Sequence, residues 1–293
     1  MRLQLQRFVL SKAVPLVISR GSSSGVEHLL VMLEHSSCVG LGETGSFDTG
    51  HQGYSTDTIA AELEAIAPQV SHVGAELEGL LADGTSAPWP SDHLAPLLEG
   101  LSPPARCGLD LALHDWWGKR LGLPLHQLWG LDINSCVATS VTLGLGSVEA
   151  VLARLELWWS QLPASRIKLK LGSPDGLEHD RALVRAVAQR LQQRQQQAGG
   201  ALELQVDANG GWDLDAARTM APWLSELGVV LLEQPLPPQR DAAADTAGFA
   251  ALKPCCQLPL VADESCWNLA DVERLAPHVD GINIKLLKCG GLS

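Results

Sequence analysis

The chain has 293 residues, of which 46% are hydrophobic, enough to fill one large α/β domain or a barrel with a smaller partner. Its 33 acidic and 21 basic residues give a net charge of -12, which argues against nucleic acid or an anionic membrane as a partner. No apolar run reaches the roughly 20 residues that span a bilayer and no secretory signal begins the chain, so the cytoplasm is the expected compartment.

The first hundred residues predict a small α+β unit. Strand-like runs occur at residues 2–10, 27–35 and 38–43, and a Gly/Ser-rich turn precedes the second of them, which is typical of an antiparallel sheet. Residues 56–82 then carry apolar side chains at helical spacing, and a Pro-rich break follows. We therefore expect a sheet followed by helices in this part of the chain.

A different pattern begins near the middle of the chain. A helix is predicted at residues 105–121, because Gly122 and Pro124 follow as a stop signal. From Thr139 onward, six short apolar or alternating runs recur, separated by stretches of helical pattern. Repeated βα units of this kind favour a TIM-type barrel over an open doubly wound sheet, since no G-x-G-x-x-G follows the first strand.

The predicted barrel region has fewer residues than a complete TIM-type barrel needs. A complete barrel takes roughly 250 residues, and residues 139–293 offer far fewer. We therefore expect an incomplete (β/α)7β barrel that lacks its last strands, either completed in another way or C-terminally truncated. The unpaired sixth strand invites association or misfolding, so a homo-oligomer stays open.

Three acidic residues follow three consecutive predicted strands. Asp207, Glu233 and Asp263 occupy equivalent positions at the carboxyl ends of the strands, where polar side chains of a TIM barrel share one mouth. Carboxylates brought together there repel one another unless a cation joins them, and hard oxygen ligands suit Mg²⁺, with Mn²⁺ as a substitute. Each acid alone would more often be a helix N-cap, but three in register favour a metal site.

Three lysines lie in other apolar runs of the same region. Lys168 and Lys170 are two residues apart, so strand periodicity puts both side chains on one face, which we expect to be the barrel interior. Two neighbouring ammonium groups disfavour double protonation, so one of them can serve as a base. Lys285 repeats the pattern on the sixth strand, roughly across the barrel. One lysine removing a proton and another returning it would suit a racemisation.

The motifs K-x-K, D-x-N, E-Q-P, D-E-S and N-I-K-L-x-K-x-G-G occur in this order along the chain. Together they resemble the enolase superfamily, specifically its muconate-lactonising subgroup, and within it the dipeptide epimerases of the L-Ala-D/L-Glu type. Sites of that superfamily pair a lysine or histidine base with Mg²⁺. The resemblance implies that Asp207, Glu233 and Asp263 hold the metal, and that Lys170 and Lys285 form the acid/base pair.

Four further roles are implied by the same resemblance. Lys168 would assist Lys170 and lie near the substrate carboxylate. Arg20 matches an arginine of the cap domain that contacts the free carboxylate of a dipeptide, although an ordinary exposed arginine in a turn is equally expected. Asn209 and Glu264 would orient the metal ligands.

The resemblance divides the chain into two domains. Residues 1–125 would form an α+β capping domain, and residues 126–293 the barrel domain, truncated after its sixth strand. Residues 40–58 resemble the cap loop that closes over the mouth and helps to select the substrate. His51 and His114 have no partner in the sequence, so we expect both to be structural.

These observations predict a Mg²⁺-dependent racemase or epimerase that removes the proton next to a carboxylate, with a dipeptide as the favoured substrate. The metal would hold that carboxylate and stabilise the enediolate. o-Succinylbenzoate synthase, N-acylamino acid racemase and muconate cycloisomerase have similar ligands and lysines, so these activities stay open. An inactive truncated fragment is the alternative from another class.

Overall fold

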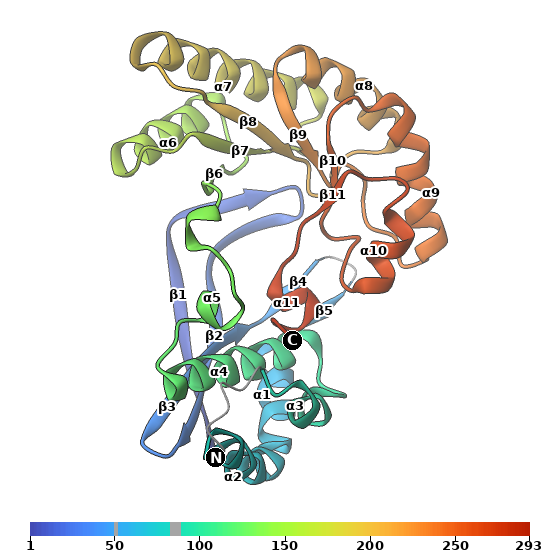
Figure 1. Ribbon diagram of the computed structural model, residues 1–293. Helices are drawn as coiled ribbons and strands as arrows, with labels where there is room; N and C mark the ends of the chain where they lie inside the picture. Colours follow the sequence, from blue (N-terminus) through green and yellow to red (C-terminus); the bar gives the residue numbers. More distant parts are fainter. Residues whose placement is uncertain (50–51, 83–88) are drawn as a thin grey trace. The chain divides into compact units, whose positions relative to one another are not determined.

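The computed structural model describes residues 1–49, 52–82 and 89–293 (Figure 1), so His51 and part of the predicted cap loop lie outside the described residues. The chain forms two compact units. The first contains Met1–Ser11, Gly25–Cys136 and Lys285–Ser293, and the second contains Lys12–Ser24 and Val137–Ile284. The predicted domain boundary at residue 125 stays a prediction, because these units follow spatial contacts rather than chain order.

The first unit is built on an antiparallel sheet with the strand order β1-β2-β3. The strands are β1 (Arg2–Ile18), β2 (Gly21–His35) and β3 (Cys38–Gly45), and a separate short pair is formed by β4 (Phe47–Asp48) and β5 (Gly53–Tyr54). The helices are α1 (Thr56–Ala65), α2 (Ala67–Ala82), α3 (Ser91–Leu98), α4 (Pro103–Leu121), α5 (Leu125–Leu128), the 3-10 turn η1 (Ile133–Ser135) and the final turn α11 (Leu286–Cys289).

Helix α4 packs directly on β3, and glycine makes this approach possible. A Cβ at Gly40 would lie 2.2 Å from the carbonyl oxygen of Ala112, and one at Gly42 would lie 2.1 Å from that of Gly108. Any side chain at these strand positions would push the helix off the sheet. The close contact buries Trp116 in the core of the unit.

The second unit holds a parallel sheet of six strands in sequential order, which confirms the predicted α/β fold class. The strands are β6 (Ser140–Leu143), β7 (Arg166–Lys170), β8 (Glu203–Asp207), β9 (Val229–Glu233), β10 (Leu260–Ala262) and β11 (Gly281–Ile282). The connecting helices are α6 (Val148–Gln161), α7 (Leu177–Ala198), α8 (Leu214–Glu226), α9 (Ala242–Leu252) with the turn η2 (Lys253–Cys255), and α10 (Leu269–Leu275). Figure 1 shows these helices along the outer side of the curved sheet.

The register of the sheet aligns its polar strand ends. Lys170 on β7 pairs with Asp207 on β8, and Asp207 in turn pairs with Glu233 on β9. Parallel strands joined by helices end on the same edge, so residues at their carboxyl ends become neighbours. The hydrophobic residues that alternate with the lysines, Ile167 and Leu169, are fully buried in the core of the unit.

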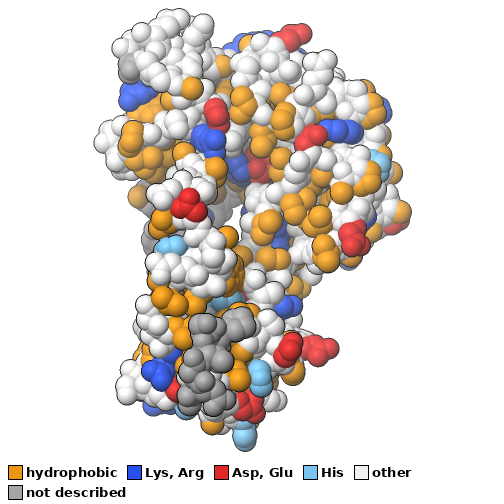
Figure 2. Space-filling view, viewed as in Figure 1, with side chains coloured by type: hydrophobic (Ala, Val, Ile, Leu, Met, Phe, Trp, Pro, Cys, Tyr) orange, Lys and Arg blue, Asp and Glu red, His pale blue; other side chains and the backbone are white. Residues whose placement is uncertain are grey.

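On the face in Figure 2, acidic and basic side chains are interspersed with apolar ones rather than gathered into one basic patch. Among the helices of the described residues, none is long and apolar enough to cross a membrane.

Candidate metal centre

Three buried carboxylates meet at the carboxyl edge of the parallel sheet. Asp207 and Glu233 are the last residues of β8 and β9, and Asp263 follows the end of β10. One oxygen of each lies within 4.8 Å of the others, and the three residues are no more than 3% exposed. Buried anions this close need positive charge beside them, and three converging carboxylate oxygens are a donor set that fits a metal ion.

Burial changes the acidity of this cluster. Loss of water around Asp207 raises its pKa to about 7, and the negative charge of Glu233 acts in the same direction, whereas Lys170 opposes both. Burial thus makes Asp207 a weaker acid than an exposed aspartate. A bound cation would favour the carboxylate, because it replaces the lost solvation of the charge.

Two lysines of β7 neutralise the carboxylates in pairs. The Nζ atom of Lys168 lies 2.5 Å from Oε2 of Glu233, and that of Lys170 lies 2.6 Å from Oδ2 of Asp207. Both side chains are mostly buried, at 16% and 13% exposure. Lys170 faces Asp207 of the adjacent strand β8, and Lys168 faces Glu233 of β9, the next strand beyond it. The repulsion expected between the two ammonium groups is therefore offset by a carboxylate beside each of them.

A second set of polar residues connects Arg20 to the carboxylates. Asn209 donates its backbone N–H to Oδ1 of Asp207 over 2.8 Å, and its side-chain amide donates to Oε1 of Glu264 over 3.2 Å. Arg20 donates to the same Glu264 oxygen and to the carbonyl of Asn209, each over 2.8 Å. Asn209 adopts a left-handed conformation, with φ of 46°, which asparagine tolerates better than most residues.

This polar set contains acceptors without a partner. Among the described residues, neither Oε2 of Glu264 nor Oδ1 of Asn209 accepts a hydrogen bond, although both atoms are buried. Buried acceptors of this kind are usually satisfied by water or by a ligand. The arrangement therefore fits a site that takes up polar groups.

Sequence reasoning missed two residues that hold the carboxylates. Asn283, directly after β11, donates to Oε1 of Glu233 over 2.8 Å. Gln234, with φ of 34°, accepts the backbone N–H of Asp263 over 2.8 Å and thereby connects the ends of β9 and β10. Gln234 belongs to the motif E-Q-P, and Asn283 begins the motif N-I-K-L-x-K-x-G-G. Their positions close to a predicted metal ligand and a predicted catalytic lysine could have identified them.

The predicted place of Lys285 on the sixth strand is wrong. Strand β11 ends at Ile282 because it pairs with β10 over only two residues, and Lys285 immediately precedes α11. Its contacts place it in the first compact unit, whereas the carboxylates belong to the second. The part of Lys285 in the chemistry therefore stays a prediction.

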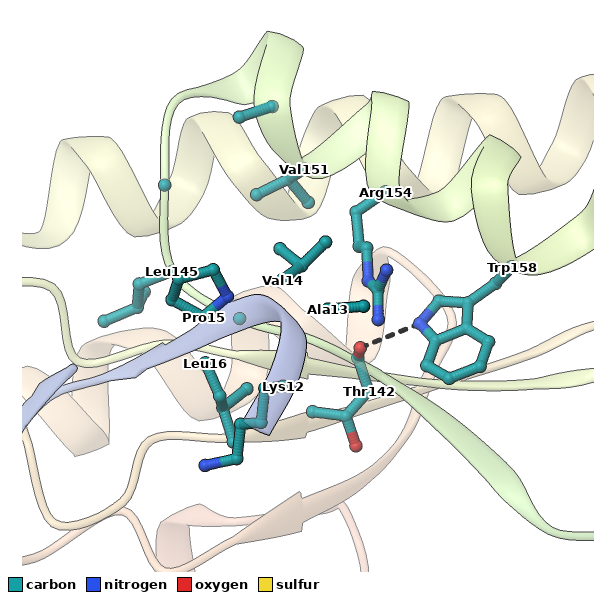
Figure 3. Close-up of a pocket in the computed structure, with 13 residues that line it drawn as sticks. Lys12, Ala13, Val14, Pro15, Leu16, Thr142, Leu145, Val151, Arg154 and Trp158 are labelled. Carbon is teal, nitrogen blue, oxygen red and sulfur yellow. Dashed lines mark hydrogen bonds between the residues drawn. The ribbon is translucent and has the colours of Figure 1, made fainter. Parts of the chain in front are cut away.

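A cavity of about 390 Å³ in the second unit lies between residues 12–16 and α6 (Figure 3). Trp158 donates its indole N–H to the carbonyl of Thr142 there, and the guanidinium of Arg154 lies 4.6 Å from the centre of the Trp158 ring. Among the described residues that line the cavity there is no carboxylate or imidazole, so it offers no usual ligand for a metal ion. Its charged side chains are those of Lys12 and Arg154, and none of the predicted site residues lines it.

The chain matches two family models over most of its length and known proteins over all of it. Residues 4–130 match the N-terminal domain of mandelate racemase / muconate lactonizing enzyme, and residues 150–293 match the enolase C-terminal domain-like family. A hydrophobic dipeptide epimerase of Roseobacter litoralis is 36% identical over 100% of this chain and 77% of its own length. One of a Flavobacteria bacterium is 33% identical over 100% of this chain and 76% of its own length.

Solved structures agree with this assignment. The substrate-liganded L-Ala-D/L-Glu epimerase from Bacillus subtilis superposes with a TM-score of 0.81 and 25% identity, covering 99% of this chain and 76% of that one. A dipeptide epimerase from Enterococcus faecalis, complexed with Mg and L-Leu-L-Tyr, gives a TM-score of 0.79 and 25% identity, covering 99% and 75%. With this fold and these matches, the chain belongs to the mandelate racemase / muconate lactonizing enzyme family of the enolase superfamily.

Proposed function

We propose that this chain epimerises dipeptides by removing and returning the proton on the carbon next to a carboxylate, with Mg²⁺ held by Asp207, Glu233 and Asp263. The observation that carries the proposal is the buried carboxylate cluster with a lysine ammonium against two of its members. Mn²⁺ is the expected substitute, because it accepts the same oxygen ligands. Relatives named dipeptide epimerases support the choice of substrate.

The carbon acid next to a carboxylate is too weak for a lysine alone. Mg²⁺ at the carboxylates would bind the substrate carboxylate and stabilise the negative charge that develops as the proton leaves. With Mg²⁺ bound, the three carboxylate ligands, the two lysine charges and a substrate carboxylate would together be close to electrically neutral. The residues therefore fit both the metal and an anionic substrate.

The lysines would divide the proton transfer between them. Lys170, once it has lost a proton to solvent, accepts the proton of one epimer at its Nζ atom. Inversion requires that a different group donate a proton to the other face of the carbon, and Lys285 is the candidate. Lys168, which forms an ion pair with Glu233, would attract the substrate carboxylate and assist Lys170.

Arg20 would bind the free carboxylate of the dipeptide. Its guanidinium is held by the buried Glu264 yet remains 29% exposed, so donors are left for a ligand. A guanidinium fixed in this way loses little freedom when it binds a second carboxylate. Glu264 would orient Arg20, and Asn209 would orient both Arg20 and Asp207.

The test is incorporation of deuterium at the α-carbon. The protein is incubated with Mg²⁺ in D₂O with L-Ala-L-Glu and, separately, with L-Leu-L-Tyr, and exchange and epimer formation are followed by NMR. We expect exchange with at least one of these dipeptides and none with the matched variant Asp263→Asn. A folded, Mg²⁺-binding protein that exchanges neither dipeptide would overturn the proposal and favour an inactive fragment.

A further inference from the structure

The residues after Lys285 are held tightly against α4. Asp110, in the middle of α4 and fully buried, accepts the backbone N–H groups of Leu292 over 2.6 Å and of Ser293 over 3.3 Å. The hydroxyl of Ser293 donates to the other oxygen of Asp110. One buried carboxylate thus fixes the conformation of the last two residues.

Close packing requires glycine at the bend of this segment. Gly291 has φ of +118°, and a Cβ there would lie 2.4 Å from Oδ2 of Asp110. Gly290 has φ of +90°, and a Cβ would lie 2.9 Å from Cδ of Arg106. Glycine accepts both the conformation and the proximity, so the two residues let the backbone reach Asp110.

The charge of Asp110 makes this attachment strong. Burial alone would raise the pKa of Asp110, but hydrogen bonds from His114, Ser293 and Leu292 hold it below its usual value. The ring of His114 stacks on Trp89 with 3.4 Å between centroids, and Trp89 donates its indole N–H to Ser293. Hydrogen bonds to a buried carboxylate are stronger than those between neutral groups.

A continuous set of backbone hydrogen bonds runs from this attachment to Lys285. The carbonyl of Lys285 accepts the N–H groups of Lys288 and Cys289, over 2.8 and 3.1 Å, which defines the single turn of α11. The next carbonyl, that of Leu286, accepts from Gly290 and Gly291 over 2.9 and 3.1 Å. A displacement of the segment at Asp110 is therefore passed on to the backbone of Lys285, because consecutive backbone hydrogen bonds connect residues 285–291.

We propose that Asp110 is a positioning residue for Lys285: by holding residues 291–293 on α4, it fixes the backbone from which Lys285 delivers its proton. This proposal rests on the proposed function, in which Lys285 serves one epimer and Lys170 the other. Misplacing a reacting group by about 1 Å can cost roughly 100-fold in rate. Weakening the attachment should therefore slow one epimer selectively.

The test compares deuterium exchange from the two epimers of one dipeptide. Lys285→Ala first identifies the epimer whose exchange depends on Lys285. We expect Asp110→Asn to slow exchange of that same epimer by about 10- to 100-fold, with exchange of the other epimer changed less than about threefold. KM should change little for either epimer, because Asp110 is not proposed to contact the substrate.

Asp115→Asn is the matched control on the same helix. Asp115 accepts from the backbone of Leu41 and pairs with Lys119, away from the terminal segment. Its loss should leave the ratio of the two exchange rates unchanged. If Asp110→Asn fails to fold, Ser293→Ala, which removes the hydroxyl contacts with Asp110 and Trp89 but keeps the backbone ones, should change the ratio in the same direction by a smaller factor.

Two results would overturn the proposal that Asp110 positions Lys285. A third would overturn the proposed function instead. An equal loss of exchange for both epimers would mean that Asp110 only stabilises the fold. An unchanged ratio in folded Asp110→Asn would mean that Lys285 does not depend on the attachment. Absence of exchange in the unaltered protein would instead defeat the proposed function itself.

Discussion

Asp207 combines three features that rarely occur together: complete burial, a place at a strand end and contact with a lysine. Its identity and position were predictable, because an acid after an apolar strand is visible in the sequence. Its acidity was not, since a pKa of about 7 depends on desolvation and on Glu233 and Lys170 from neighbouring strands. This acidity gives the metal site a dependence on pH.

We expect the apparent affinity for Mg²⁺ to fall by about tenfold between pH 8 and pH 6, because protons compete with the metal for Asp207 below its pKa of about 7. The sign follows from the raised pKa, since the acid must lose a proton before it can bind a cation. Calorimetric titration with Mg²⁺ at pH 6, 7 and 8 measures this. Equal affinity at all three values would show that Asp207 is already ionised or is not a ligand.

Lys170→Ala should remove proton transfer for one epimer alone. General acid-base groups contribute roughly 100- to 10,000-fold to rate, so exchange of the epimer that uses Lys170 should fall by that factor. Exchange of the other epimer should fall far less. Deuterium incorporation from each pure epimer measures both rates, and a circular dichroism spectrum checks the fold. Equal loss for both epimers would contradict a division of labour between two lysines.

At the scale of elements, β7 illustrates a prediction that needed no tertiary information. Alternation along residues 166–171 separates the buried Ile167 and Leu169 from the lysines, as strand geometry requires. Strand β11 illustrates the opposite case. An apolar run such as residues 281–287 does not distinguish a strand from a helix, and its short pairing with β10 decides where the strand ends.

The turn after β7 should be sensitive to a side chain. Gly172 has φ of +78°, and a Cβ would lie 2.5 Å from the carbonyl oxygen of Ala208, next to Asp207. Gly228 has nearly the same φ, +77°, with open space around it. Gly228→Ala should cost about 1 kcal/mol in the free energy of unfolding, and Gly172→Ala about 2 kcal/mol more because its backbone must shift.

Urea unfolding followed by tryptophan fluorescence compares the two glycine variants. The midpoint of Gly172→Ala should lie clearly below that of Gly228→Ala, which in turn lies slightly below that of the unaltered protein. Mg²⁺ affinity should fall only in Gly172→Ala. Equal midpoints for the two variants would mean that the contact with Ala208 relaxes at no cost.

At the scale of the whole molecule, the two compact units differ in what they contain. The second unit holds all three carboxylates, both lysines of β7 and Arg20, because residues 12–24 are counted with it. The first unit holds Lys285 together with α4 and Asp110. Each unit therefore draws on separate parts of the sequence, and the predicted boundary at residue 125 stays a prediction.

Mg²⁺ should therefore stabilise the second unit selectively. At a Mg²⁺ concentration 100 times its Kd, binding contributes about 2.7 kcal/mol to the folded state, which corresponds to several degrees in Tm. Glu233→Gln keeps the shape of the side chain but removes a charge, so its Tm should rise much less. Differential scanning calorimetry with and without Mg²⁺ measures both shifts. A similar rise in the variant would place the ion elsewhere.

The sequence by itself determined the fold class, the family and the carboxylates at the strand ends, because these depend on local periodicity and on short motifs. Only the tertiary structure decided which lysine faces which acid, how Glu264 holds Arg20, and that Asp110 holds Ser293, 183 residues away. Such contacts join residues far apart in the chain, and no local pattern of apolar and polar side chains specifies their geometry. Packing of the complete units does so, by bringing buried charges to the partners that can satisfy them.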